Sequence, residues 1–134
     1  MTGRFRAVVP IIPSERQTQR AILAMCGTCF PDVLIHHSPN GAQLAGNPTA
    51  RFKQIGALKG DGMRKGFVDL IAIWSGGVAF IEVKRPKLGR LSPEQAVMIE
   101  RLRGMGWPVA VVTSTDEAHT FLKNSGAPCV GELS

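Results

Sequence analysis

Two apolar, β-rich segments, residues 67–74 and 78–84, follow one another in the middle of the chain around Ser75-Gly76-Gly77. A short glycine-containing connection between two such segments predicts a β-hairpin. Nearly every position of both segments is apolar, which is typical of central strands that are covered on both faces. The hairpin therefore predicts a sheet that lies in the interior of the fold.

Three helices are predicted by the same pattern, a serine followed three residues later by glutamine or glutamate. The serines are Ser14, Ser92 and Ser114, and the first helix is expected to run to about Cys26. Further strands are expected at residues 33–37 and 109–113, and a short helix at residues 49–58. This order of elements predicts an α/β sandwich with a mixed sheet, and a chain of 134 residues fits one domain, residues 1–134.

The hairpin carries three charged side chains, Asp69, Glu82 and Lys84, among apolar neighbours. If Ser75-Gly76 is a two-residue loop, Asp69 lies directly opposite Glu82, and Lys84 shares their face of the sheet. A register slip of two residues would keep the three groups together, whereas a slip of one would separate them. Two facing carboxylates repel each other unless a cation lies between them, and a hard divalent ion such as Mg²⁺ is the natural occupant.

An alternative is that Asp69 and Lys84 only neutralise each other at a strand end. Glu82 and Lys84, however, follow the apolar residues 78–81, where burying extra charge is costly without a function. We therefore favour a site in which a metal-activated water attacks a phosphodiester bond. Lys84 would orient that water or stabilise charge on the phosphoryl group.

The chain is basic, because sixteen Lys and Arg residues against ten Asp and Glu residues give a net charge of +6 and a pI near 9.8. A basic surface attracts polyanions, and nucleic acid is the commonest of these partners. Charge alone leaves open a protein that is basic without binding nucleic acid. The sequence has no helix-turn-helix, zinc-finger or RRM signature, so sequence-specific reading of bases is not indicated.

Three segments together resemble the VRR-NUC (virus-type replication-repair nuclease) domain of the PD-(D/E)XK nuclease superfamily: residues 62–70, residues 81–84 and residues 91–95. The resemblance extends from Ser14 to about Leu122 and includes Pro39-Asn40-Gly41. It implies a restriction-endonuclease-like core, with a central mixed β-sheet flanked by helices. It also implies a Mg²⁺- or Mn²⁺-dependent DNA endonuclease selective for branched or four-way-junction DNA. The competing interpretation is a non-catalytic DNA-binding module of a replication or repair complex.

The resemblance assigns roles to individual residues of the hairpin. Asp69, Glu82 and the backbone carbonyl of Val83 would be metal ligands, and Lys84 would be the catalytic lysine. Val68 stands where the superfamily has proline. Proline at that position shapes the backbone and binds no metal, so its loss removes no ligand.

Two further residues match the family but also have a simpler explanation. Glu15 matches an acidic residue near the metal, and a glutamate in the first turn of a helix also complements the helix dipole. Gln95 matches a glutamine near the active site, and it also completes the capping box that begins at Ser92. The sequence leaves both alternatives open.

Basic residues flank the hairpin on both sides, and phosphate contacts are their expected use, although each one alone is also consistent with a solvated charged rim. Glycines 60, 62 and 66 would let the preceding loop approach a backbone closely. The strongest candidates for nucleic-acid contacts are Lys59, Arg64, Lys65, Arg85 and Lys87, with Arg51, Lys53 and Arg90 nearby.

Stand-alone members of the family that this sequence resembles behave as dimers, so the resemblance also implies a homodimer. The apolar stretch Ala7–Ile12 is the candidate interface, and an edge strand is the alternative for this stretch. Cys26 and Cys29, followed by His36-His37, have the spacing of a zinc half-site, but a second close ligand pair is absent and we expect no zinc or redox site there. With no membrane span or secretory signal in the sequence, the expected location is the cytoplasm.

Overall fold

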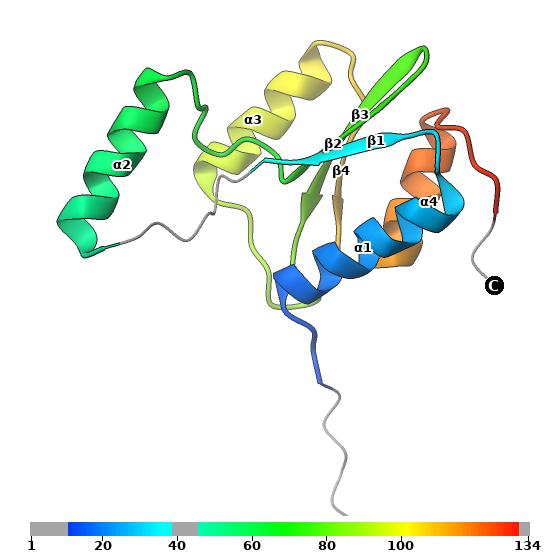
Figure 1. Cartoon of the computed structure of the whole chain (residues 1–134), viewed down its shortest axis with the longest axis horizontal. Helices are drawn as coiled ribbons and strands as arrows, with labels where there is room; N and C mark the ends of the chain where they lie inside the picture. The colour runs from blue at the N-terminus through cyan, green and yellow to red at the C-terminus, as the bar shows by residue number, and fades with distance from the viewer. Residues whose placement is uncertain (1–10, 39–45, 132–134) are drawn as a thin grey trace, which may run out of the picture.

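Four strands form one mixed sheet in the order β1-β2-β3-β4 (Figure 1). The structure is a computed structural model, and it describes residues 11–38 and 46–131 of the chain. The β1–β2 and β2–β3 pairs are antiparallel, whereas β3 and β4 are parallel and therefore need a crossover, which helix α3 supplies. The strands are β1 (Leu34–His37), β2 (Leu70–Trp74), β3 (Gly77–Val83) and β4 (Val109–Val112).

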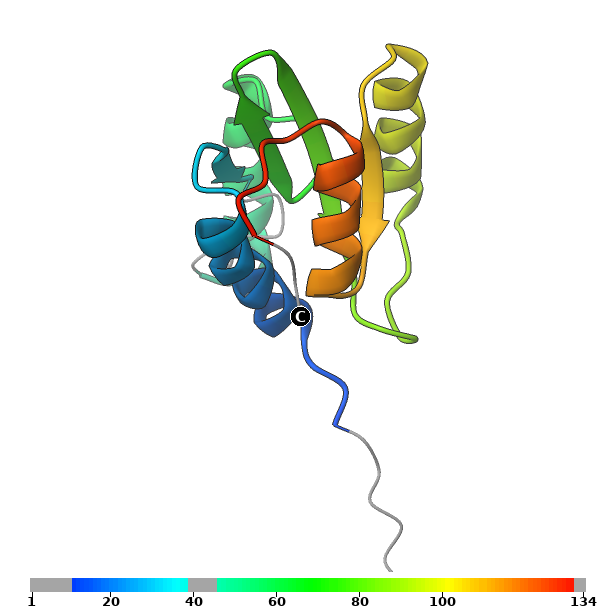
Figure 2. The same ribbon diagram turned by 90° about the vertical axis from the view of Figure 1, so that its right-hand side faces the viewer.

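Helices cover the sheet on both faces, as the side view in Figure 2 shows. Helices α1 (Glu15–Cys29) and α4 (Thr115–Asn124) pack on one face, and α3 (Pro93–Gly104) packs on the other. The predicted fold class, a restriction-endonuclease-like α/β core with a mixed sheet between helices, is confirmed.

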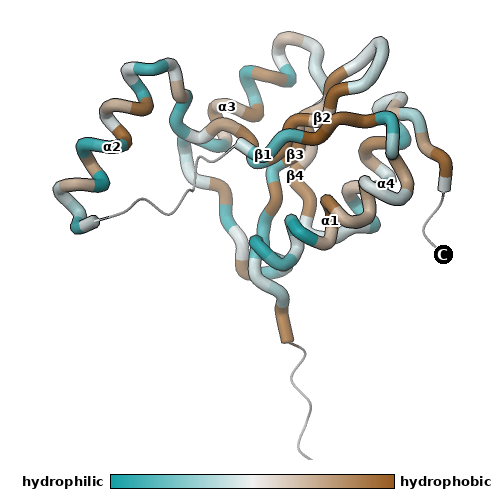
Figure 3. Tube along the Cα trace, in the orientation of Figure 1, coloured by the Kyte–Doolittle hydropathy of each residue, from teal (hydrophilic) through white to brown (hydrophobic). Residues whose placement is uncertain are grey.

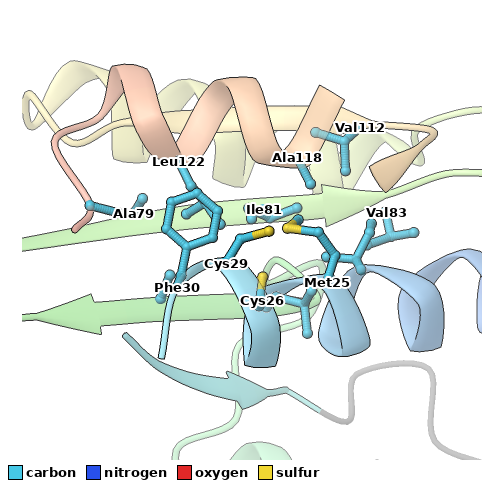
Figure 4. Packing of buried hydrophobic residues seen from close by; sticks show 14 residues of the cluster. Met25, Cys26, Cys29, Phe30, Ala79, Ile81, Val83, Val112, Ala118 and Leu122 are labelled. Atoms are coloured by element: carbon cyan, nitrogen blue, oxygen red, sulfur yellow. The ribbon is translucent and has the colours of Figure 1, made fainter. Parts of the chain in front are cut away.

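The larger part of the core lies between the sheet and the α1–α4 layer, where Phe30, Ile81 and Leu122 are almost completely buried (Figure 4). Ile22 of α1 is completely buried in the same cluster. A second cluster, built around Phe80 and Ile99, fills the space between the sheet and α3. Strand β3 contributes to both clusters with alternate side chains, which explains why its sequence is apolar at nearly every position. The second face of β3 also carries Glu82.

Serine caps begin three of the helices as predicted. Ser14 and Ser92 form complete capping boxes, and the side chain of Ser114 accepts a hydrogen bond from the Glu117 amide. Two predicted boundaries were wrong. Helix α1 continues past Cys26 to Cys29, because both cysteine side chains face the core three residues apart and packing sustains the extra turn.

The second wrong boundary is the start of β2, which begins at Leu70 and not at residue 67. The chain turns immediately before it, where the Phe67 amide donates to the carbonyl of Arg64 and Gly66 has a positive φ of 79°. Residue 69 then bonds to β3 through its side chain, so the regular backbone ladder begins one residue later.

Helix α2 (Pro48–Gly60) extends slightly beyond the helix predicted at residues 49–58. Asn47 caps its first turn, and Gly62, at a φ of 107°, ends it with the paired hydrogen bonds of a Schellman motif. None of its residues is buried, and it stands apart from the sheet in Figure 1. In Figure 3 hydrophilic and hydrophobic residues are interspersed along the helix.

Within the part of the chain that the structure describes, no helix combines the length and the apolar character that crossing a membrane requires. Two sequence features fall outside those residues. The segment Pro39-Asn40-Gly41 does so entirely, and the candidate dimer stretch Ala7–Ile12 does so except for Ile11 and Ile12.

Candidate active site

The hairpin has the register that the two-residue loop predicted, because Trp74 pairs with Gly77 and Leu70 pairs with Ile81. One step further, this register brings Asp69 opposite Glu82. The Oδ2 atom of Asp69 accepts a hydrogen bond of 2.8 Å from the Val83 amide. At this end of the strand pair, a side-chain oxygen therefore takes the place of a backbone carbonyl. Asp69 is thereby fixed beside the last two residues of β3.

Glu82 is the most unusual residue of this region, because a carboxylate with no solvent exposure lies in an otherwise apolar strand. Its Oε1 accepts a hydrogen bond of 2.9 Å from Gln95 Nε2 and lies 3.8 Å from Lys84 Nζ. Its Oε2 is buried and has no hydrogen-bond partner among the described residues. An unsatisfied buried carboxylate oxygen is costly, so this atom requires a proton or a cation.

Burial is the main reason that the pKa of Glu82 rises from 4.5 to about 8. The neighbouring Asp69 carboxylate raises this pKa further, through its charge and through a side-chain hydrogen bond, and Glu15 adds a smaller effect of the same sign. The ammonium group of Lys84 lowers it in part but does not cancel the other effects. In the absence of a bound cation, Glu82 is therefore largely protonated at neutral pH.

Gln95 serves the helix cap and the carboxylate at the same time. Its side-chain oxygen accepts from the Ser92 amide at 2.9 Å, which closes the capping box, while its Nε2 donates to Glu82. The two explanations that the sequence left open for this residue are therefore compatible. The cap fixes the Gln95 side chain, and the fixed side chain orients Glu82.

Gly66 holds the preceding loop against the first turn of α3. A Cβ atom on this glycine would lie 2.6 Å from the carbonyl carbon of Glu94 and 2.8 Å from the amide nitrogen of Gln95. Beside it, Lys65 Nζ forms an exposed ion pair of 3.2 Å with Glu94. The backbone that Gly66 approaches is thus that of α3, and the contact sets the position of Gln95.

Glu15, the first residue of α1, is exposed, yet its charge reaches Glu82, as the pKa of that residue shows. The site therefore has a fully buried carboxylate, a half-buried one and an exposed one. The backbone carbonyl of Asp69 accepts from the Ser38 amide at 2.7 Å and lies 3.2 Å from His37 Nδ1. His37 in turn contacts Gln19. Nothing in the sequence pattern links residues 19 and 37 to Asp69, so these contacts were not foreseen.

The oxygen-rich donor set suits a hard cation. Mg²⁺ is typically held by one or two carboxylates together with water, and Mn²⁺ accepts the same oxygen ligands. The partnerless Oε2 of Glu82 beside Asp69 fits this chemistry. Among the described residues no group of three or more His, Cys, Asp and Glu side chains is arranged to hold a metal ion. Cys26 and Cys29 are buried in the core, where burial and the neighbouring Cys29 raise the pKa of Cys26 to about 12.

The five basic residues proposed for nucleic-acid contacts have different surroundings. Arg85 donates to the carbonyls of Ile12 and Pro13, so its guanidinium anchors the segment that leads into α1. Lys65 is paired with Glu94, as described above. Lys59, Arg64 and Lys87 are exposed, and Lys87 adopts a left-handed backbone with a φ of 61°.

Comparison with known families agrees with this geometry. The profile of the VRR-NUC domain matches residues 14–116 of the 134-residue chain. The chain belongs to the VRR-NUC family. Membership of this family implies a nuclease-type activity with DNA as a partner, and VRR-NUC nucleases are generally metal-dependent.

Two solved structures share the fold of this VRR-NUC chain. One, described as a VRR_NUC domain protein, superposes with a TM-score of 0.60 at 20% identity and covers 89% of this chain and 93% of its own. The other, described as a VRR_NUC domain, gives a TM-score of 0.54 at 21% identity and covers 83% of this chain and 97% of its own. No curated protein sequence matches the chain significantly.

The raised pKa of Glu82 predicts how the stability of the metal-free VRR-NUC chain depends on pH. Between about pH 5 and pH 8 the folded protein binds more protons at Glu82 than the unfolded chain does, so the free energy of unfolding falls as pH rises through this window. Urea unfolding in EDTA over a pH series measures the effect, with Glu82→Gln as the control that lacks the titrating group. Parallel pH profiles for the parent and Glu82→Gln would show that Glu82 has an ordinary pKa.

The contact at Gly66 predicts a difference between two glycine substitutions. Gly62 and Gly66 both have a positive φ, but a Cβ at Gly62 would meet nothing within 4 Å. We expect Gly62→Ala to lower the free energy of unfolding by about 1–2 kcal/mol through backbone strain alone. Gly66→Ala should lower it by a further 1–3 kcal/mol, approximately, because the α3 backbone must shift. Urea unfolding measures both, and equal losses would show that the loop is not packed against α3 as described.

Proposed function

We propose that this VRR-NUC chain is a Mg²⁺- or Mn²⁺-dependent DNA endonuclease. Its active site lies at the open end of the β2–β3 hairpin, where β2 begins and β3 ends. The observation that carries the proposal is the buried Glu82, whose Oε2 lacks a partner beside the Asp69 carboxylate. A structural ion pair would leave neither a partnerless oxygen nor a pKa near 8. The membership of a nuclease family supports the same conclusion.

The metal ligands that we propose are Asp69, Glu82 and the backbone carbonyl of Val83, with Glu15 contributing from the start of α1. A divalent cation supplies Lewis acidity toward the phosphodiester and makes water a better nucleophile at neutral pH. Two hydrogen bonds orient the carboxylates toward the cation. The Val83 amide holds one oxygen of Asp69, and Gln95 holds one oxygen of Glu82, which leaves the other oxygen of each carboxylate for the cation.

Lys84 is the proposed catalytic lysine. Its side chain is about nine-tenths buried and Nζ lies 3.8 Å from Glu82 Oε1, so its charge acts on the Glu82 carboxylate with little screening by bulk water. A positive charge held in this way stabilises the negative charge that develops on the phosphoryl group during attack. Gln95 acts as a positioning residue, because it orients Glu82 and does not itself contact a reacting atom.

The substrate that we propose is branched DNA, such as a four-way junction, bound through phosphate contacts. Arg64 and Lys87 are exposed basic residues on the loops before and after the hairpin, and Lys59 is exposed in the last turn of α2. Lys65 is an exposed lysine in an ion pair that phosphate can replace. Arg85 would act indirectly, by holding residues 12–13 beside the site. The alternative, a DNA-binding module without catalysis, is disfavoured because a buried carboxylate repels phosphate and adds nothing to binding.

The proposal includes a homodimer. One Asp69–Glu82 site cuts one strand per engagement, whereas a two-fold symmetric dimer presents two sites to two strands of opposite polarity. The expected location is the cytoplasm, and the single domain is expected to span residues 1–134. Light scattering should report about twice the 14.4 kDa chain mass, and a monomer that still makes paired cuts in four-way junctions would contradict the dimer.

The proposed site predicts which substitutions abolish cleavage. Asp69→Ala, Glu82→Ala and Lys84→Ala should each lower the rate of Mg²⁺-dependent cleavage of a labelled junction by at least about 100-fold. DNA binding should survive in all three, because the phosphate contacts come from other residues. Gel assays of cleavage and fluorescence anisotropy of binding measure the two effects separately.

Asp116→Ala is the matched control for these variants, since Asp116 is an exposed carboxylate on α4. It should cleave at the parent rate. If Glu82→Ala also cleaves at the parent rate, the active site lies elsewhere. If the parent binds junctions but no divalent metal supports cleavage, the chain is a binding module.

A further inference from the structure

Helix α2 is the one helix of the described residues that has no buried residue. It extends away from the sheet (Figures 1 and 3). An isolated helix of 13 residues is marginally stable in water, and this one also contains Gly56 and ends at Gly60. A helix that contributes nothing to the core but has well-formed caps at both ends is typical of an element whose packing partner is another molecule.

The charge of this region indicates what that partner is. Residues 46–65 contain five basic residues and one acidic residue, a net charge of +4 out of +6 for the whole chain. Within α2 the basic residues are Arg51, Lys53 and Lys59, there is no acidic residue, and none of the three forms an ion pair with any described residue. Such a concentration of unneutralised charge on an exposed helix is complementary to a polyanion.

One aromatic side chain lies among these charges. Phe52 is 79% exposed and stands between Arg51 and Lys53 in the sequence. Adjacent helical positions are about 100° apart, so the two cations flank the ring on either side, and Lys59 follows on the same face about two turns later. An exposed ring bordered by cations matches the way proteins hold unpaired nucleotides, by stacking a base and contacting the neighbouring phosphates.

A second copy of the chain is a poorer match for this helix. Two copies of α2 packed symmetrically against each other would bring two identical sets of positive charges together, which opposes association. The apolar surface is also limited, because Leu58 is 39% exposed and Ile55 is half-buried, so Phe52 is the main apolar group that α2 presents.

We infer that α2 is an arm that recognises unpaired DNA, with Phe52 stacking on an exposed base while Arg51, Lys53 and Lys59 contact the flanking phosphates. This inference rests on the proposed function, since it assumes that DNA is the substrate. It assigns the selectivity for branched over fully paired DNA to an element outside the Asp69–Glu82 site. The arm therefore acts on binding and not on the chemical step.

The test compares binding of a labelled forked DNA and a fully paired duplex of equal length by fluorescence anisotropy in EDTA, where the proposed metal-dependent cleavage cannot occur. Phe52→Ala should weaken binding to the fork about tenfold and binding to the duplex less than twofold. Phe52→Trp should bind the fork as the parent does, and Phe52→Leu should not, because stacking needs a ring. Leu34→Ala, which alters another exposed apolar residue, should change neither affinity.

The charged residues of the arm give an independent measurement. Arg51→Gln with Lys53→Gln should weaken binding to both DNAs and lower the slope of log affinity against log salt by about 1.4–1.8, depending on whether the contacts lie on single-stranded or duplex DNA. Two neutralised charges placed elsewhere, Arg16→Gln with Arg20→Gln on exposed positions of α1, should weaken binding much less.

Several results would overturn the inference. Binding of Phe52→Ala to the fork within twofold of the parent would do so, as would equal weakening on fork and duplex. A Phe52→Ala protein that changes from dimer to monomer in light scattering, with unchanged affinity per chain, would assign α2 to a second copy. The proposed function fails separately: a parent that binds forks through Phe52 but never cleaves DNA would refute catalysis and retain the arm.

Discussion

The structure of this VRR-NUC chain is organised around one electrostatic constraint, the burial of Glu82 next to Asp69. Burying a carboxylate is costly, and a second carboxylate beside it raises the cost. Lys84 offsets part of this cost and Gln95 supplies one hydrogen bond, yet one oxygen of Glu82 remains without a partner. Without a cation, a proton on Glu82 relieves the repulsion between the two carboxylates, and a divalent cation in the same place would remove it.

The fold holds this arrangement from three directions. The hairpin register brings Asp69 to Glu82, and the parallel β4 strand covers the other edge of β3. Helix α3 supplies Gln95, whose position depends on the Ser92 capping box and on the close approach of Gly66 to its first turn. The Ser92 capping box and Gly66 therefore stabilise the fold and also set the geometry of the carboxylates.

The sequence predicted this region well because its signals are local. A two-residue loop fixes the register of a hairpin, and that register alone brings Asp69 opposite Glu82. The start of β2 was mispredicted because the Asp69 side chain replaces a backbone bond, which a pattern of apolar residues does not reveal. The approach of Gly66 to α3 and the contacts of Arg85 with residues 12–13 join distant parts of the chain, and no local spacing encodes them. The complete lack of buried residues in α2 was equally hidden, because its mixed apolar and polar sequence does not reveal whether one face of the helix packs on the core.

Calorimetric titration of the metal-free protein with Mn²⁺ measures whether a divalent cation replaces the proton on Glu82. Repeating the titration in buffers of different ionisation enthalpy counts the protons released. Because the pKa of Glu82 is about 8, binding at pH 7 should release about one proton per site, and this release should fall toward zero above pH 9. Glu82→Gln should abolish both the binding and the release. Binding that releases no proton at pH 7, or that persists unchanged in Glu82→Gln, would show that Glu82 is not a ligand of the cation.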